Sequence, residues 1–147
     1  MHDPFQLNRF IKAQEYNFER ALMEIKNGRK TSHWMWYIFP QVKGLGKTFF
    51  SEYYSIKSSI EAKSYLKHDT LGPRLISATE ALLNHKHKSA KEIFGLTDYL
   101  KLKSSLTLFQ CISEEKKPFE TALVYFFRGT KCAFTVDFLK RDLEQIP

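Results

Sequence analysis

The segment that organises this sequence reads Lys30-Thr31-Ser32-His33-Trp34-Met35-Trp36-Tyr37-Ile38-Phe39-Pro40-Gln41, and Gly44-Leu45-Gly46-Lys47 follows shortly after it. It holds both tryptophans of the chain, with a histidine, a tyrosine and flanking lysines. Ser32 is expected to cap a short helix from His33 to Phe39, because its hydroxyl can accept an amide proton of the first turn. Pro40 ends that helix, and Gly44 and Gly46 predict a loop whose backbone can approach a ligand closely.

Length and composition indicate one ordinary domain. The chain has 147 residues, of which 43% are hydrophobic and 15% aromatic, so residues 1–147 are expected to form a single domain with a substantial core. Two cysteines are too few for a disulfide framework, which favours a reducing compartment. The first residues do not resemble a secretion signal, and no apolar run approaches a membrane span. We therefore expect a soluble, cytoplasmic protein with no membrane partner.

The positive charge is concentrated in the middle of the chain. The formal net charge is +7, and residues 26–103 hold 14 basic and 6 acidic side chains against 9 and 10 in the two flanks. A concentrated positive field attracts phosphate, either on a small anionic ligand or along a nucleic acid. A solvated lysine-rich surface that keeps the protein soluble explains the same pattern equally well.

Helical periodicity dominates on both sides of the tryptophan segment. Asp3-Pro4 is typical of an N-cap followed by proline in the first helical turn, and Gly28, Gly95 and Gly129 are placed as helix stops. There is no alternating strand pattern, so we expect a mainly α, single compact domain of about seven to nine helices with few or no strands. After the helix at Asp3-Pro4, the predicted helices are Glu15–Asn27, Ser59–Lys67, Leu71–His85, Ala90–Phe94, one through Leu102 to Ile112, one that begins at Pro118, and one through Val136 to Ile146.

Short motifs along the whole chain resemble one family, the DUF1810 family of small bacterial and fungal proteins. They are Asp3-Pro4-Phe5, Arg9-Phe10, Ala13-Gln14, Gly28-Arg29-Lys30, the block from Ser32 to Gln41, Gly44-Leu45-Gly46, Tyr65-Leu66, Leu71-Gly72-Pro73-Arg74-Leu75, Ile93-Phe94-Gly95, Asp98, and the run from Leu102 to Phe109. The resemblance implies a compact, mainly helical fold, and a common site built from the tryptophan block and the helix that carries Lys103. The family is named for its unknown function, so the resemblance assigns no catalytic residue.

A looser arrangement resembles a second family. Glu61-Ala62-Lys63, ahead of a late helix with Asp98, Lys103 and Phe109, is similar to the YbiA or NADAR proteins, which act on ADP-ribose derivatives. This likeness implies a ligand class, and nothing about individual residues.

His33 is the best candidate for acid or base chemistry, because an imidazole titrates near neutral pH. A structural hydrogen-bonding role for His33 is the alternative. Trp34 and Trp36 are two residues apart and point to different faces of a helix, so at most one is expected to line a cleft while the other packs inward. An exposed ring there would stack on a base or a nicotinamide.

The helix around residue 103 is a candidate phosphate site. Lys103, Ser104 and Thr107 can share one helical face and hold a phosphate by charge-assisted hydrogen bonds; otherwise the serine is a small packing residue. Lys30 and Arg74 are comparable candidates, for which ordinary surface charge is the alternative. The predicted ligand-binding set is Lys30, Ser32, Trp34, Trp36, Gln41, Gly44, Gly46, Arg74, Lys103, Ser104 and Thr107, with His33 as the catalytic candidate.

Several site types are excluded by their missing motifs. The glycines fit neither the dinucleotide-binding pattern nor the P-loop pattern. His85 and His87 have no acidic or cysteine partner at metal-ligand spacing, so no metal and no cofactor are expected.

Three functions remain open. The first is a cleft formed by His33, Trp34 or Trp36, Gln41 and the Lys103 helix, which binds an anionic nucleotide-like ligand such as ADP-ribose or NAD and hydrolyses it with His33 as acid or base. The second is nucleic-acid binding through the basic middle of the chain. The third is a protein-interaction or inhibitor module that exposes the aromatic block. Spacing alone leaves open the oligomeric state, and whether the tryptophan block folds against the Lys103 helix.

Overall fold

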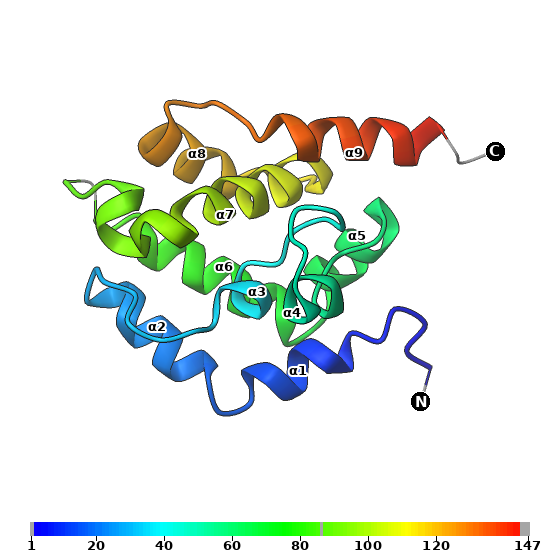
Figure 1. Ribbon diagram of the computed structural model, residues 1–147, viewed down its shortest axis with the longest axis horizontal. Coiled ribbons are helices and arrows are strands. Elements are labelled where there is room, and N and C mark those ends of the chain that lie inside the picture. Colours follow the sequence, from blue (N-terminus) through cyan, green and yellow to red (C-terminus); the bar gives the residue numbers. More distant parts are fainter. Residues whose placement is uncertain (1, 86, 145–147) are drawn as a thin grey trace.

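Nine α-helices and no β-strand are present in the residues that the structure, a computed structural model, describes, namely 2–85 and 87–144 (Figure 1). The predicted all-α fold is confirmed, although Ile146 of the predicted last helix lies outside the described residues. The helices are α1 (Asn8–Gln14), α2 (Phe18–Lys26), α3 (Met35–Ile38), α4 (Phe49–Tyr53), α5 (Ser59–Lys67), α6 (Leu71–Leu82), α7 (Ala90–Ile112), α8 (Phe119–Phe127) and α9 (Ala133–Glu144).

Helix α7 is the centre of the packing. It contacts α5, α8 and α9, while α6 contacts α2, α5 and α8. The buried ring of Phe109 on α7 lies 5.5 Å from the ring of Tyr65 on α5 and 5.9 Å from that of Phe119 on α8, measured between centroids. Burial of such large aromatic side chains supplies much of the hydrophobic free energy of a core.

A glycine kink divides α7 near its start. Ser89 opens the helix with a capping box, in which its hydroxyl accepts the N–H of Glu92 and its own N–H donates to the Glu92 carboxylate. Gly95 then takes φ 82° and ψ 170°, a conformation open almost only to glycine. The predicted stop at Gly95 is therefore present, but as a kink inside one helix. The chain on both sides of the kink borders the same pocket.

The first helix begins later than the sequence predicts. Instead of starting at Pro4, α1 starts at Asn8, because Gln6 has φ 53° and breaks any earlier turn. The Asp3 carboxylate still caps this end of the chain, since it accepts the N–H groups of Leu7 at 2.9 Å and Asn8 at 3.0 Å.

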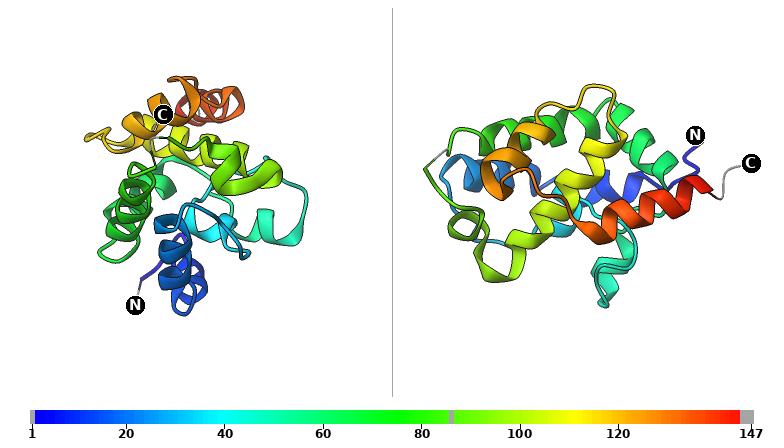
Figure 2. Two further views of the ribbon diagram at one scale, coloured as in Figure 1. Left: turned by 90° about the vertical axis from the view of Figure 1, so that its left-hand side faces the viewer. Right: turned by 90° about the horizontal axis from the view of Figure 1, so that it is seen from above.

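Helix α4 is an element that the sequence analysis missed. Thr48 and Ser51 form a capping box, with Ser51 N donating to Thr48 Oγ1 at 3.2 Å and Thr48 N donating to Ser51 Oγ at 2.9 Å. In both views of Figure 2, α4 projects from the body of the molecule. Its Phe49, Phe50 and Tyr53 side chains are exposed.

Two polar contacts join segments that are far apart in the sequence. The first centres on Arg9, whose side chain is only 5% exposed. Its guanidinium donates to the carbonyl oxygens of Phe5, Gln6, Tyr53 and Ser55 and to the Glu61 carboxylate, the last at 2.6 Å. In the second contact, the N–H of Ser59 at the start of α5 donates to Asp142 of α9 at 2.9 Å.

No helix in the described part of the chain combines the length and the hydropathy that a membrane crossing needs.

Candidate functional site

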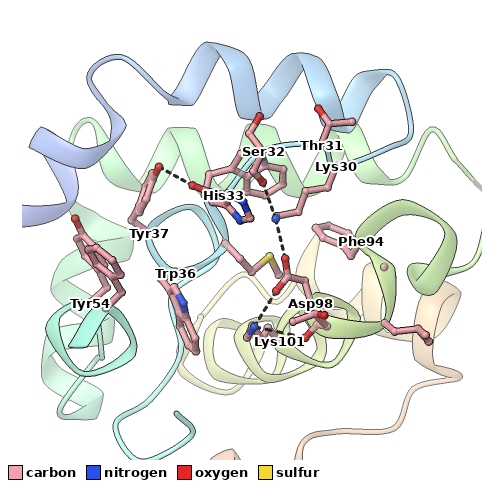
Figure 3. Close-up of a pocket in the computed structure, with 16 residues that line it drawn as sticks. Lys30, Thr31, Ser32, His33, Trp36, Tyr37, Tyr54, Phe94, Asp98 and Lys101 are labelled. Atoms are coloured by element: carbon pink, nitrogen blue, oxygen red, sulfur yellow. Dashed lines mark hydrogen bonds and ion pairs between the residues drawn. The ribbon is translucent and has the colours of Figure 1, made fainter. Parts of the chain in front are cut away.

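One pocket gathers five of the side chains that the sequence analysis selected (Figure 3). Its volume is about 680 Å³, within the range of small-molecule sites. The lining comprises residues 30–37, Phe50 and Tyr54 from α4 and the residue after it, residues 94–98, and Lys101 of α7. Lys30, Ser32, His33, Trp34 and Trp36 are the selected residues among them.

The end of α2 directs the tryptophan segment toward α7. Gly28 has φ 78°, its N–H donates to Ile25 O at 2.9 Å, and Arg29 N donates to Glu24 O at 3.0 Å. This is a Schellman motif, so the predicted C-cap at Gly28 is confirmed. The N–H of Lys30 then donates to the carbonyl oxygen of Ile93 at 2.7 Å, which fixes the segment beside the first part of α7.

Glu24 fixes the start of the tryptophan segment by hydrogen bonds. Its buried carboxylate accepts the N–H of Thr31 at 2.7 Å, the N–H of Ser32 at 3.0 Å, the indole N–H of Trp34 at 2.9 Å, and the Ser32 hydroxyl. Burial acts to raise the pKa of this carboxyl, but the hydrogen bonds from Ser32, Thr31 and Trp34 prevail and lower it to about 2. Glu24 therefore stays ionised and fixes the Trp34 ring.

Two lysines share one carboxylate at the mouth of the pocket. Lys30 Nζ lies 2.7 Å from Asp98 Oδ2, and Lys101 Nζ lies 2.8 Å from Asp98 Oδ1 (Figure 3). Burial acts to raise the pKa of Asp98, but the hydrogen bonds from Lys101 and Lys30 hold it below its usual range. Two ammonium groups and one carboxylate leave this cluster with a surplus positive charge.

Each of these lysines also lies over a tryptophan. Lys30 Nζ is 5.1 Å from the Trp34 ring centroid, and Lys101 Nζ is 4.8 Å from that of Trp36. Both distances are within the range of cation–π attraction. Trp34 is 2% exposed and closes the base of the pocket, whereas Trp36 is half-buried. The two rings thus differ in burial, but both line the pocket, so the prediction that at most one of them lines a cleft is wrong.

A pair of tyrosines faces the charged cluster. The rings of Tyr37 and Tyr54 lie 5.3 Å apart, and the Tyr37 hydroxyl donates to the carbonyl oxygen of His33 at 3.2 Å. Burial raises the pKa of Tyr37, and that of Tyr54 as well. Both phenols are therefore neutral hydrogen-bonding groups at neutral pH. The His33 side chain is exposed beside them.

Three other predicted residues lie behind or beside the pocket. Gly46 lies against Trp36, since a Cβ placed there would be 3.0 Å from the ring atom Cη2. Gly44 lies against Phe134 of α9, and Gln41 is buried outside the pocket lining. The glycine loop thus forms no wall of the pocket, and Gly46 allows the chain to approach first Ser51, 2.5 Å from such a Cβ, and then Trp36.

Arg74 belongs to a different part of the molecule. Its Nη1 atom donates to Gln14 Oε1 at 3.3 Å, and its guanidinium lies 5.2 Å from the Phe18 ring centroid. It therefore joins α6 to the end of α1 and to α2.

Lys103, Ser104 and Thr107 lie away from the pocket, on the side of α7 that packs against α8 and α9. Lys103 Nζ is 5.9 Å from the Phe127 ring of α8, and Thr107 Oγ1 accepts the N–H of Cys132 at 3.0 Å. Successive helical residues are about 100° apart, so residues 101 and 103 point in nearly opposite directions. The helix that borders the tryptophan segment does so with Asp98 and Lys101 instead.

The sequence analysis selected neither Asp98 and Lys101, which line the pocket, nor Glu24, which bonds to its wall. A carboxylate in the last turn of a helix, where the macrodipole disfavours it, is a signal that Glu24 has partners elsewhere. Asp98 and Lys101 are an i, i+3 ion pair, a spacing that sequence alone reveals.

Among the described residues, no group of three or more potential metal ligands comes together. His85, which the sequence analysis considered, lies with Nε2 2.7 Å from the carbonyl oxygen of Ile25.

The sequence and the fold both match known proteins. Residues 4–139 match the family described as "Protein of unknown function (DUF1810)". A crystal structure of the conserved hypothetical protein Rv1873 from Mycobacterium tuberculosis has 41% sequence identity and a TM-score of 0.92, covering 94% of this chain and 99% of that one. No curated protein matches the chain.

Proposed function

The chain belongs to the DUF1810 family, and we propose that its pocket between residues 30–37 and α7 binds a small anionic ligand with a planar ring, of the nucleotide class. The observation that carries this proposal is the cluster of Lys30, Asp98 and Lys101, which sets the partly exposed ammonium group of Lys101 beside the half-buried ring of Trp36. Pockets that hold small ligands combine apolar ring surfaces with a few converging polar groups.

The two lysines differ in access to a ligand. The Lys101 side chain is 23% exposed and that of Lys30 only 7%. Lys30 Nζ also donates to the carbonyl oxygen of Ser32 at 2.6 Å, whereas the matching contact of Lys101 Nζ, with Thr97 O, is longer at 3.4 Å. An acidic group that enters the pocket therefore meets Lys101, and a planar ring attached to it lies among Trp36, Tyr37 and Tyr54.

Hydrolysis of the bound ligand is the catalytic extension of the proposal. His33 lies at the same pocket and is the candidate for proton transfer, because its imidazole is exposed and of the right chemical type. The carbonyl oxygen of His33 accepts a hydrogen bond from the Tyr37 hydroxyl, which fixes the backbone that carries the imidazole.

Binding can be measured by tryptophan fluorescence, because Trp34 is buried and Trp36 is the more accessible of the two tryptophans in the chain. We expect AMP, ADP-ribose or NAD to quench the emission, adenosine to do so weakly, and Trp36→Phe to abolish the change. Failure of all three anionic compounds to change the fluorescence, or to raise the melting temperature, would contradict the proposal.

A pair of lysine variants tests which face of α7 meets the ligand. Lys101→Met should weaken binding by about tenfold or more, which corresponds to one charge-assisted contact of about 1.4 kcal/mol. Lys103→Met, two residues further along the helix, is the matched control and should bind like the wild type. The reverse result would assign the ligand to the Lys103 side that the sequence alone suggests.

Turnover is tested separately from binding. Chromatography of ADP-ribose or NAD after incubation should show cleavage by the wild type and loss of cleavage by His33→Ala, with quenching retained in the variant. If the wild type binds the compounds without cleaving them, the binding hypothesis stands and the hydrolase hypothesis is wrong.

Single-stranded nucleic acid is a second candidate ligand because of α4. Phe49 is 72% exposed and Phe50 58%, and Lys47 lies just before them in the chain. Exposed rings beside basic side chains provide stacking surfaces for unpaired bases. Oligonucleotide binding, measured by fluorescence anisotropy, should weaken steeply with added salt and with Phe49→Ala. The interaction-module hypothesis has less support, because Trp34 and Phe39 of the tryptophan segment are buried.

A further inference from the structure

Cys132 lies at the junction of α7 and α9. It occupies the position directly before α9, where its carbonyl oxygen accepts the N–H of Val136 at 3.1 Å. Its own N–H donates to Thr107 Oγ1 at 3.0 Å. The Ser104 hydroxyl lies 3.4 Å from its sulfur and 3.2 Å from Leu100 O, and can donate its one proton to either. The residue is partly exposed, so a small reagent can reach it.

The surroundings of the sulfur favour a negative charge. Burial acts to raise the pKa of the Cys132 thiol, but the nearby hydroxyls of Ser104 and Thr135 and the N–H groups of Thr135 and Phe134 favour the thiolate and hold the pKa below its usual range. The N–H groups belong to the first turn of α9, whose dipole adds to the effect.

The Thr135 side chain also indicates that a hydrogen-bond acceptor fits at the start of α9. Its side chain is fully buried, and its Oγ1 atom makes no hydrogen bond of ordinary geometry with any described residue, the Cys132 sulfur included. A buried hydroxyl without a partner costs about 1–3 kcal/mol. A thiolate, or an oxygen attached to the sulfur, would accept the Thr135 proton and remove this cost.

We propose that Cys132 is a reactive thiol, a modification site that hydrogen peroxide oxidises to the sulfenic acid. The thiolate sulfur attacks one peroxide oxygen, an S–O bond forms, and the O–O bond breaks. Hydroxide leaves and takes up a proton, so that sulfur loses two electrons and peroxide gains them. This site is separate from the pocket at Lys101, and it does not depend on the proposed ligand.

Cys111 provides a reference within the same molecule. Its sulfur lies 3.6 Å from Gln110 Oε1, near the end of α7 rather than at the start of a helix. It therefore lacks the amide donors that surround Cys132.

The test is the rate of alkylation by iodoacetamide between pH 5 and 9, measured on the folded full-length protein and assigned to each cysteine by peptide mass spectrometry. We expect Cys132 to react at least about threefold faster than Cys111 at pH 7, and its pH midpoint to lie lower. The midpoint is decisive, because it reports the pKa of each thiol and not how readily iodoacetamide reaches the sulfur. Equal midpoints for the two cysteines would overturn the proposal.

Two variants test whether the hydroxyls of Thr135 and Ser104 cause the reactivity of the Cys132 thiol. Thr135→Val removes the hydroxyl at nearly constant volume, and Ser104→Ala removes the second one. Each should raise the pH midpoint of Cys132 and slow its oxidation by peroxide, trapped with dimedone, by about threefold. Thr130→Val is the matched control, because the Thr130 hydroxyl donates to Phe127 O at 2.7 Å and not to sulfur. Circular dichroism identifies any variant that is unfolded, and one folded donor variant suffices. A midpoint unchanged from the wild type in the folded donor variants would also overturn the proposal.

Discussion

Glu24 is the single residue on which the shape of the pocket depends most. Its carboxylate accepts hydrogen bonds from Thr31, from Ser32 and from Trp34, which together make up the first part of the pocket wall. Hydrogen bonds to a buried charge are worth more than neutral ones, and removing the acceptor leaves buried donors unsatisfied.

Replacing Glu24 with glutamine should lower the free energy of unfolding at pH 7 by about 1–3 kcal/mol, because an amide accepts fewer hydrogen bonds and carries no charge. Urea denaturation of both proteins measures the difference. The emission of Trp34 should also change, since its indole N–H donates to this carboxylate. An unchanged unfolding midpoint would show that the loop is held by other contacts.

The pH dependence of this difference has a definite sign. The pKa of Glu24 is lowered from 4.5 to about 2, so its contribution to stability is complete above about pH 4.5 and is lost as the pH falls toward 2. The stability gap between wild type and Glu24→Gln should therefore narrow over this interval. A gap of constant size down to pH 2 would contradict the lowered pKa.

At the residue scale, the sequence predicts the place of part of the pocket better than the full set of residues that line it. The contrast between Trp34 and Trp36 follows from their spacing, and the structure has one buried and the other half-buried. Lys101 and Asp98 were missed because helical periodicity does not say which face of a long helix meets a segment some 65 residues earlier. For the same reason Lys103 was selected, although it lies beside α8.

At the element scale, Gly72 determines how closely α5 and α6 approach. A Cβ at this position would lie 2.0 Å from the carbonyl oxygen of Leu66, a backbone atom that cannot rotate away. Glycine is normally the weaker helix former, so its presence inside α6 reflects this contact and not a local preference.

Gly72→Ala should therefore destabilise the protein by about 1–3 kcal/mol, against the gain that alanine gives in an open helix, because the two helices must separate. Ser77→Ala, on the exposed side of the same helix, is the control and should be neutral or slightly stabilising. Thermal denaturation followed by circular dichroism compares the two. If both variants melt like the wild type, the contact with Leu66 relaxes without cost.

Elements with clear periodicity are the ones that the sequence predicts well. The predicted cap at Ser32 is wrong, because α3 is only Met35–Ile38 and the Ser32 hydroxyl donates to Glu24 instead. The bounds of α5, Ser59–Lys67, are those expected. Gly28 and Gly95 take the positive φ angles that a helix end or a kink requires. Helix α4 was missed because five residues with exposed aromatic rings show no amphipathic period. Local backbone geometry at Gln6 likewise moves the start of α1 in a way that the Asp3-Pro4 pattern does not reveal.

At the scale of the whole molecule, Arg9 is a junction between the N-terminal segment, the chain after α4, and α5. Arg9→Met should lower the free energy of unfolding by about 3–5 kcal/mol, because Glu61 would be left buried without its cation. Asp137→Asn is the control, since the ion pair of Asp137 with Arg141 is largely exposed and should matter little. Chemical denaturation compares the variants. Equal losses in the free energy of unfolding would mean that the buried Arg9–Glu61 pair contributes no more to stability than the exposed one.

The overall class of the fold is readable from the sequence, whereas its assembly is not. Absence of strand periodicity and the family motifs both predict an all-α protein, which the structure confirms. The arrangement around α7 depends on contacts such as that of Tyr65 with Phe109, which join residues far apart in the chain and leave no local pattern.

The hydrogen bond from Ser59 to Asp142 has a consequence for synthesis on the ribosome. Residue 142 is translated long after residue 59, and the tunnel shields the newest part of the chain. The first amide of α5 therefore stays open to water until residue 142 has been made and has left the tunnel. This contact is then expected to close long after α5 itself has emerged, rather than helix by helix as the chain emerges.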